Sequence, residues 1–220
     1  MSGTGERDGL TLSLMYGEGA LFGGDRDDDL NLSFGRGLLD GGAGDDRLTL
    51  SYGEGALLGG EGADWLTLSF GRGYLDGGAG DDRLMLAFGE GALVGGAGDD
   101  SLELQFGRGS LDGGMGDDML ALRHGEGSLY GGAGDDVLAV NQAQASLSGG
   151  AGADRFVIEG PTSVSILDYC LAEGDTIAIA AGAGQYSATQ VGNDVYLHSV
   201  DWSSTIRLVD YELAQGLSVV

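Results

Sequence analysis

The stretch that decides the fold is GGAGDDRLMLAFGEGALV, residues 77–94, because it recurs along most of the chain with a period of 18 residues. The leucine near its end recurs at Leu21, Leu39, Leu57, Leu75, Leu93, Leu111, Leu129 and Leu147. The turns that open each copy begin at Gly23, Gly41, Gly59, Gly77, Gly95, Gly113, Gly131 and Gly149, with a degenerate copy at Gly5. A fixed period of this length predicts a solenoid.

The same stretch predicts the structure of one coil. Leu84, Leu86 and Phe88 occupy every second position, which is typical of a strand with one buried face. Leu93 predicts a second, very short strand, and the two glycine clusters predict the turns, where a positive φ is easy for glycine. Stacked coils place equivalent residues about 4.8 Å apart and form two parallel sheets around a thin leucine core.

The predicted fold is therefore all-β: a parallel β-roll, or β-solenoid, of 18-residue coils with a small C-terminal β cap. The solenoid is expected over residues 1–159, as eight clear coils and one degenerate N-terminal coil, and the cap over residues 160–220. Pro161 opens this second region, after the period has ended. Its apolar runs predict strands over Ser163–Leu167, Thr176–Ala180, Asp194–Ser199 and Thr205–Leu208.

The composition excludes several functional classes. The 220 residues include 46 glycines, 35 acidic and 10 basic residues, and the net charge is −25. So acidic a surface repels nucleic acids and anionic membranes. The absence of lysine excludes a Walker phosphate loop, and the single cysteine, Cys170, excludes an internal disulfide or a cysteine-rich zinc site. No apolar run approaches the ~20 residues of a membrane span.

The acidic residues fall at fixed places in the turns. One column holds Asp28, Asp46, Asp64, Asp82, Asp100, Asp118, Asp136 and Asp154. The residue before each is also Asp in six of the eight turns. Columns of carboxylates at coil spacing repel one another unless a cation lies between the turns. Carboxylates and the carbonyls of glycine-rich turns are ligands that Ca²⁺ prefers, and the turns contain no His or Cys for a softer metal.

The turns read Gly-Gly-x-Gly-x-Asp-x-Leu-x and so resemble the RTX calcium-binding nonapeptide repeat, over about residues 23–156. The resemblance implies Ca²⁺ between successive turns on one edge, held by the Asp column above and by turn carbonyls. The carbonyls expected to contribute are those of Gly41, Ala43, Gly59, Glu61, Gly77, Ala79, Gly95, Ala97, Gly113, Met115, Gly131, Ala133, Gly149 and Ala151. Eight turns leave seven gaps, so about seven ions are expected. The first turn (residues 24–27) departs from the motif, so its site is the least supported by the sequence.

The acidic residues that precede this column are expected to point outward and to add to the electrostatic field without bonding to the ion. They are Asp27, Asp45, Asp81, Asp99, Asp117 and Asp135. The other edge departs from the family, because its half-turns lack the motif Asp. Its charges alternate instead, through Glu18, Arg36, Glu54, Arg72, Glu90, Arg108 and Glu126, ending at Gln144. We interpret this column as a ladder of ion pairs in place of calcium; an Arg-rich binding edge is the alternative.

Two further columns concern packing. The column Tyr16, Phe34, Tyr52, Phe70, Phe88, Phe106 and His124 shares the inward phase, which predicts a stacked core ladder. The outer face of the short strand carries the apolar residues Phe22, Leu38, Leu58, Tyr74, Val94 and Tyr130, with Asp40, Asp76 and Asp112 between them. This face either packs against the C-terminal segment or forms a partner or self-association surface.

The C-terminal region resembles the end of many RTX exoproteins, which caps the roll and carries an uncleaved signal for the type I secretion apparatus. Met1 to Tyr16 lack the features of a cleavable secretion signal. Asp168 and Asp175 match Asp positions of such regions and are candidates for a further Ca²⁺. Cys170 is expected to be a buried small residue.

The leading hypothesis is a secreted bacterial protein, extracellular or on the cell surface, that folds on Ca²⁺ outside the cell. Its role would be structural, adhesive or self-assembling, through an uncapped N-terminal coil or the outer apolar face. The alternative is a calcium-dependent secretion and folding module of a larger exoenzyme. Ice binding through Asn31/Ser33, Thr49/Ser51 and Thr67/Ser69 is a third hypothesis, weakened where the array breaks at Met85 and Ala87. No catalytic constellation stands outside the repeat, so no enzyme is expected.

Overall fold

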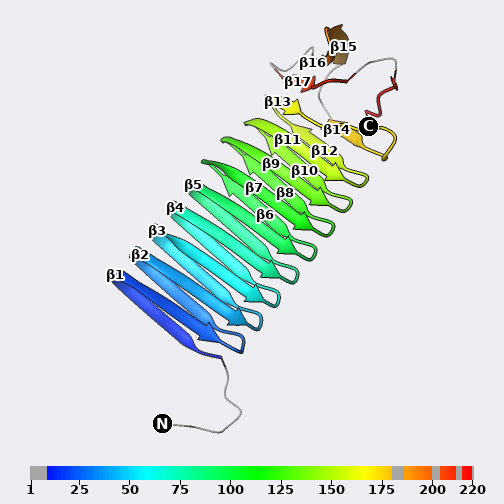
Figure 1. Ribbon diagram of the computed structural model, residues 1–220. Helices are drawn as coiled ribbons and strands as arrows, with labels where there is room; N and C mark the ends of the chain where they lie inside the picture. The colour runs from blue at the N-terminus through cyan, green and yellow to red at the C-terminus, as the bar shows by residue number, and fades with distance from the viewer. Residues whose placement is uncertain (1–8, 180–185, 200–203, 212–214, 220) are drawn as a thin grey trace, which may run out of the picture.

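The computed structural model describes residues 9–179, 186–199, 204–211 and 215–219. The chain winds into a rod of stacked coils, with the C-terminal strands at one end of the rod (Figure 1). The register between neighbouring coils is 18 residues: Leu30 pairs with Leu48, and Leu48 with Leu66. The predicted parallel β-solenoid is therefore confirmed.

The coils come in two kinds. In the first five, one strand runs through most of the coil; these are β1 (Thr11–Gly24), β2 (Asp29–Ala43), β3 (Arg47–Glu61), β4 (Trp65–Ala79) and β5 (Arg83–Ala97). In the next three the coil divides in two; the strands are β6 (Ser101–Gln105), β7 (Arg108–Met115), β8 (Met119–Arg123), β9 (Glu126–Ala133), β10 (Val137–Asn141) and β11 (Gln144–Ala151). The division falls where Phe106, His124 and Gln142 take φ angles of 49°, 54° and 51°. Earlier coils place the positive φ on a glycine instead, as at Gly71.

The core is a thin layer of leucines. From β2 to β9 each coil buries two leucines from its long arm and one from its short arm, as Leu66, Leu68 and Leu75 do at 0% exposure, and Val140 takes the place of one leucine in β10. The three columns form one continuous hydrophobic cluster along the rod. Because each coil supplies only one layer of this cluster, a coil is buried only through its neighbours.

The C-terminal strands continue the stack and then leave it. They are β12 (Arg155–Glu159), β13 (Ser163–Ile166), β14 (Thr176–Ile179), β15 (Tyr186–Val191), β16 (Asp194–Ser199) and β17 (Thr205–Leu208). β12 and β13 stack in parallel on β10 and β11, and β14 and β17 stack on them in turn. β15, β16 and β17 then form an antiparallel sheet. The four predicted strands are present, although Ala180 lies outside the described residues, and β15 was missed.

The prediction that the aromatic column fills the core was wrong. The rings do stack, with centroids 4.7–5.2 Å apart from Tyr16 to His124. However, they lie on the surface: Phe70 is 41% exposed and Tyr16 68%. The physical reason is the turn, because each ring lies where the coil reverses and the leucine layer already fills the interior. We call this side of the rod, with its rings and its Glu/Arg column, the aromatic edge.

The described part of the C-terminal segment does not cover the outer apolar face. Its described strands stack on the last coils, and none of β12–β17 makes a substantial contact with β1–β9. Phe22, Tyr74 and Tyr130 are 59, 40 and 42% exposed. For the described residues, the interpretation that this face packs against the C-terminal segment was therefore wrong. Among the described residues, no helix has the length and hydropathy of a membrane span.

Candidate metal centre

The opposite side of the rod, which we call the aspartate edge, carries the Gly-Gly-x-Gly-x-Asp turns. The eight predicted aspartates lie there in one column and are 0–5% exposed; they are Asp28, Asp46, Asp64, Asp82, Asp100, Asp118, Asp136 and Asp154. Each belongs to the turn that precedes a long arm, so the 18-residue register places them one above another. The sequence thus predicted the column correctly; that its members bind an ion stays a prediction.

One oxygen of each carboxylate ties two coils together. The backbone N–H of Asp64 donates to Oδ1 of Asp82 at 2.7 Å, and the N–H of Asp82 donates to Oδ1 of Asp100 at 2.8 Å. The pattern runs from Asp28 to Asp154 without a break. These hydrogen bonds fix the orientation of each carboxylate and so determine where its second oxygen points.

The second oxygen is the one without a partner. Oδ2 is buried and accepts no hydrogen bond in Asp46, Asp64, Asp82, Asp100, Asp118 and Asp136. A buried carboxylate oxygen left in this state is costly, and such groups normally find a donor or a cation. Six repeats of the same unpaired atom are a systematic feature of this edge.

A backbone carbonyl from the next coil faces the same place. A methyl group built on Gly77 would lie 2.2 Å from Oδ2 of Asp82 and 2.7 Å from the carbonyl oxygen of Gly95. The same pair of oxygens recurs in seven gaps, which open beside Gly23, Gly41, Gly59, Gly77, Gly95, Gly113 and Gly131. This explains why glycine is needed there, since any side chain would fill the space between two oxygens.

Burial changes the acidity of this column. Desolvation raises the pKa of Asp82, Asp100 and Asp136 to about 7, and that of Asp46, Asp118 and Asp154 to about 6. The hydrogen bond from the preceding coil opposes the shift, and neighbouring carboxylates add to it. The charged column is therefore unfavourable in the metal-free fold, and a bound cation would relieve this.

The donor set fits a hard cation. Oxygen is the only ligand atom at these turns, which suits Ca²⁺ and not a softer metal. Within the described residues, no three His, Cys, Asp or Glu side chains come together as a conventional metal cluster. A cation here would consequently take one carboxylate from a coil and its remaining ligands from backbone carbonyls.

Comparison with known proteins agrees with this geometry. The model of the RTX calcium-binding nonapeptide repeat matches residues 22–51, 58–93, 88–120 and 128–142, in four copies. The chain carries RTX calcium-binding repeats, wound into a β-roll. A similar solved structure is described as the solution structure of the AlgE6R3 subunit from the Azotobacter vinelandii mannuronan C5-epimerase. It is 25% identical, covering 64% of this chain and 78% of that one, with a TM-score of 0.26. No curated protein matches the chain.

The predicted carbonyl ligands of this β-roll fall into two groups. The first glycine of each turn, such as Gly95, presents its carbonyl toward the neighbouring Oδ2. The third residue mostly does not, because its carbonyl accepts the N–H of a glycine in the preceding coil. This bond, of 2.7–2.9 Å, is made by Glu61, Ala79, Ala97, Met115, Ala133 and Ala151. A carbonyl can accept twice, so the first group is the better supported of the two.

That the outer aspartates do not bind the ion stays a prediction, but they do accept hydrogen bonds, which the sequence analysis did not foresee. Oδ1 of Asp81 accepts the N–H of Asp99 at 3.0 Å, and Oδ1 of Asp45 accepts the N–H of Ala63 at 2.8 Å. Similar bonds start from Asp27, Asp99, Asp117 and Asp135. The outer column thus bonds toward the C-terminal neighbour, while the inner column bonds toward the N-terminal one.

The aromatic edge holds its charges as separate pairs. Arg36 lies 2.9 Å from Glu54, Arg72 2.6 Å from Glu90, and Arg108 2.9 Å from Glu126. Among the described residues the intervening steps make no such contact, so the predicted ladder is a row of three dyads. Their side chains are 49–67% exposed, so each contributes at most ~0.2–1 kcal/mol.

The cap ends the aspartate edge without an unpaired oxygen. Asp175 is 2% exposed and follows Asp154 in the column; it accepts the N–H groups of Asp154 and Cys170. Asp168 accepts the N–H of Gly149 and of Gly150. Both carboxylates are thus satisfied by the chain itself, which argues against the further Ca²⁺ considered for them. Cys170 is half-buried and free.

Proposed function

We propose that the chain is a secreted protein whose β-roll folds when Ca²⁺ binds along the aspartate edge outside the cell. The observation that carries the proposal is the row of six buried, unpaired Oδ2 atoms, with a carbonyl of the next coil facing each. About seven ions, one in each gap between turns, would complete the edge.

The physical role of the ion is to neutralise a column that otherwise opposes folding. Bound Ca²⁺ supplies positive charge and accepts oxygen ligands from two coils at once. The protein contributes carboxylates already oriented through Oδ1, as in Asp82. Because the ligands of one gap come from different coils, they come together only when the coils stack. The free energy of binding therefore becomes free energy of folding.

Calcium concentration then determines where the protein folds. Cytosolic Ca²⁺ is low and extracellular Ca²⁺ is high, so the chain would leave a bacterial cell unfolded, through the type I secretion apparatus. RTX repeat proteins are typically secreted. Outside, the rigid rod would serve a structural, adhesive or self-assembling role at the cell surface or beyond it. The proposal assigns it no catalytic activity.

The test is a titration followed by circular dichroism. In chelator at pH 8 we expect little strand signal, and added Ca²⁺ should produce it cooperatively, while equal Mg²⁺ should not because Mg²⁺ demands a tighter octahedral site. Full strand content in chelator would contradict the proposal.

The repeat offers a matched control. Asp82→Asn removes one charge and the candidate ligand, whereas Asp81→Asn removes one charge from the adjacent outer column and leaves Oδ2 of Asp82 in place. We expect the first variant to require more Ca²⁺ for folding and the second to titrate nearly as the unmodified protein does. Equal titrations would show that Asp82 is no ligand.

A second candidate is a calcium-dependent folding module of a larger exoenzyme. The specific observation is the first coil: among the described residues β1 pairs with β2 alone, and Leu10 is 50% exposed. Another domain stacked on β1 would cover it. Limited proteolysis of the protein isolated from its natural source distinguishes the two candidates. If the β-roll is a module, the protease should release it as a fragment of a larger protein.

A further inference from the structure

The aromatic edge is a large exposed apolar surface that the proposed function does not use. Seven stacked rings run along it, from Tyr16 to His124. The six hydrophobic rings are 41–68% exposed. An aromatic side chain presents ~200 Å² when free, so six rings at nearly half exposure offer roughly 500 Å² on one copy. A strip of that size is as large as the largest apolar patch of a typical single-chain protein, and such patches often have a function.

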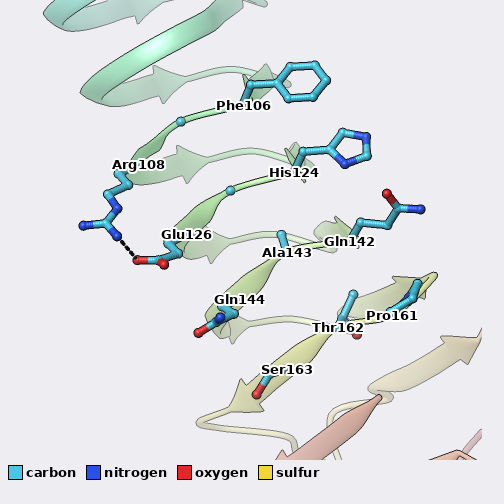
Figure 2. A pocket seen from close by; sticks show the side chains of 12 residues that line it. Phe106, Arg108, His124, Glu126, Gln142, Ala143, Gln144, Pro161, Thr162 and Ser163 are labelled. Carbon is cyan, nitrogen blue, oxygen red and sulfur yellow. Dashed lines mark ion pairs between the residues drawn. The ribbon is translucent and has the colours of Figure 1, made fainter. Parts of the chain in front are cut away.

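The edge has the form of a shallow groove with two different walls. Figure 2 shows Phe106, His124 and Gln142 on one side, and Arg108, Glu126 and Gln144 on the other. Glycines such as Gly107 and Gly125 form the floor. Equivalent grooves continue toward the N-terminal end, beside Phe34 and Arg36 and beside Phe70 and Arg72. The two walls therefore extend along most of the rod.

The charge on this edge is nearly balanced, unlike that of the rest of the molecule. Its column from Glu18 to Glu126 contains four Glu and three Arg, whereas the whole chain has 35 acidic residues and 10 basic ones. Two copies of so acidic a protein repel each other in most orientations. The balanced charges of the aromatic edge let two copies approach through it with little repulsion, and this edge also carries the exposed rings.

The alternation of sign makes the edge complementary to itself. If two edges face each other antiparallel and overlap completely, like charges meet, as Glu18 with Glu126 and Arg36 with Arg108. A shift by one coil brings a Glu opposite an Arg at six levels and, in one direction, leaves Glu18 opposite Gln144 at the two ends. The dyads Arg36–Glu54, Arg72–Glu90 and Arg108–Glu126 are evenly spaced. In that direction of the shift, each dyad of one copy therefore lies opposite a dyad of the other copy, with Arg facing Glu and Glu facing Arg.

We propose that two copies of the folded β-roll associate antiparallel through their aromatic edges, with Arg72 of each copy opposite Glu90 of the other. In this register Arg36 lies opposite Glu126, and Glu54 opposite Arg108. Ring wall meets ring wall, and six rings of each copy are covered. Complete burial of the rings would remove roughly 1,000 Å² in total from solvent, about the minimum for a specific interface, and the charged wall would add to this area.

The inference rests on the proposed function in one respect, because the edge exists only once the β-roll has folded. The experiment is therefore done in Ca²⁺, after circular dichroism has shown each variant to be folded, and association is measured by sedimentation. A variant that fails to fold bears on the folding proposal, whereas a folded monomer bears on this one.

The presence of the interface is tested by two variants and their mixture. One carries Arg36→Glu, Arg72→Glu and Arg108→Glu; the other carries Glu54→Arg, Glu90→Arg and Glu126→Arg. Each alone places like charges at all of these Glu–Arg levels and should dimerise at least about tenfold more weakly than the unmodified protein. Their equimolar mixture should dimerise more tightly than either alone. The aromatic edges of the two variants carry opposite charge, and their general attraction would also favour the mixture, so the register needs a separate test.

The register is tested by mixing two single variants, Arg72→Glu and Glu90→Arg. Both break the same internal dyad, so a structural effect of the dyad cannot recover on mixing. In the proposed register the mixed dimer alone restores both Arg–Glu contacts, and it should be tighter than either homodimer. A mixture no tighter than the two homodimers, or an unmodified protein that is folded yet monomeric at about 100 μM, would overturn the proposal.

Discussion

The two edges of the rod close the same coil by different chemistry. On the aspartate edge, Asp82 is 1% exposed and its Oδ2 has no partner. On the aromatic edge, the side chains of Arg72 and Glu90 are 65 and 51% exposed, and they form an ion pair with each other. The first edge thus needs something from outside the chain, and the second does not. The comparison therefore places the proposed calcium dependence in one half of each repeat.

The position of the glycines differs in the same sense. At the aspartate edge a methyl group on Gly77 would meet a carboxylate and a carbonyl oxygen together. At the aromatic edge a methyl group on Gly71 would meet only the backbone of Gly53. Glycine therefore allows close stacking on both edges, and on the aspartate edge it also leaves room between two oxygens.

The largest expected effect comes from removing ligands on the aspartate edge. Asp82→Asn with Asp100→Asn should weaken the calcium response of folding by about tenfold or more, because two adjacent gaps each lose their charged ligand. The control changes the same number of charges on the other edge, by Glu90→Gln with Arg108→Gln. A calcium titration followed by circular dichroism compares them, and equal midpoints would refute the division of roles.

The next largest effect is expected from acidification, which acts through the carboxylates of the aspartate edge. The pKa of Asp82, Asp100 and Asp136 is raised to about 7 in the metal-free fold, against about 4 in an unfolded chain. Between these values the folded state binds more protons, so its stability falls as pH rises. In chelator, strand content should therefore increase as pH falls from 8 toward 4. In Ca²⁺ the apparent affinity should decrease over the same change, because protons compete for the carboxylates.

The pH prediction is checked by circular dichroism at fixed chelator or calcium concentration. A strand signal in chelator that is lost on acidification would contradict it, because the sign would then be that of carboxylates with lowered pKa. Asp81→Asn serves as the control, since the inner column remains intact in that variant.

A smaller effect is expected from the stacked rings. Tyr52 lies 5.0 Å from Phe34 and 4.9 Å from Phe70, nearly parallel to both. Tyr52→Ala should lower the free energy of unfolding in Ca²⁺ by about 1–3 kcal/mol, through two lost ring contacts and some apolar area. The calcium midpoint should shift far less than in the Asp82→Asn variant. Chemical denaturation at saturating Ca²⁺ measures the loss of stability. A loss of calcium binding in this variant would contradict the prediction, because it would show that the ring column contributes to the metal sites.

The smallest effect is expected from one exposed dyad. Arg72→Gln should cost no more than about 1 kcal/mol, because the partners are half exposed, and the cost should shrink in high salt. Thermal unfolding at two salt concentrations checks this. A cost that is large and independent of salt would mean that the dyad is more deeply packed than its exposure indicates.

The period of 18 residues was sufficient to predict the coil, the register and the aspartate column. It was insufficient at the corners, where the alternation of side chains no longer indicates burial. Phe88 follows Leu84 and Leu86 in phase, yet it is 42% exposed because the chain reverses there. The hydrogen bonds of the outer aspartates were missed for a related reason: their bonds to the next coil depend on turn conformation, which spacing alone does not determine.

The cap was predicted less completely, because it lacks the repeat. β13, β14, β16 and β17 follow from apolar runs, but β15, residues 186–191 with the sequence YSATQV, has too little alternation to stand out. Asp175 continues the aspartate column with a spacing of 21 residues from Asp154. That departure from 18 concealed its place in the stack, and its bond to Cys170 could be found only from the fold.

The most direct test of the central claim is anomalous diffraction from crystals grown in Ca²⁺. The account predicts seven calcium peaks, each between two coils: six beside the unpaired Oδ2 atoms of Asp46 to Asp136, and one beside Oδ2 of Asp28. It predicts none along the aromatic edge, where Arg72 and Glu90 satisfy each other. Peaks distributed over both edges, or an aspartate edge without calcium in a fully folded β-roll, would contradict it.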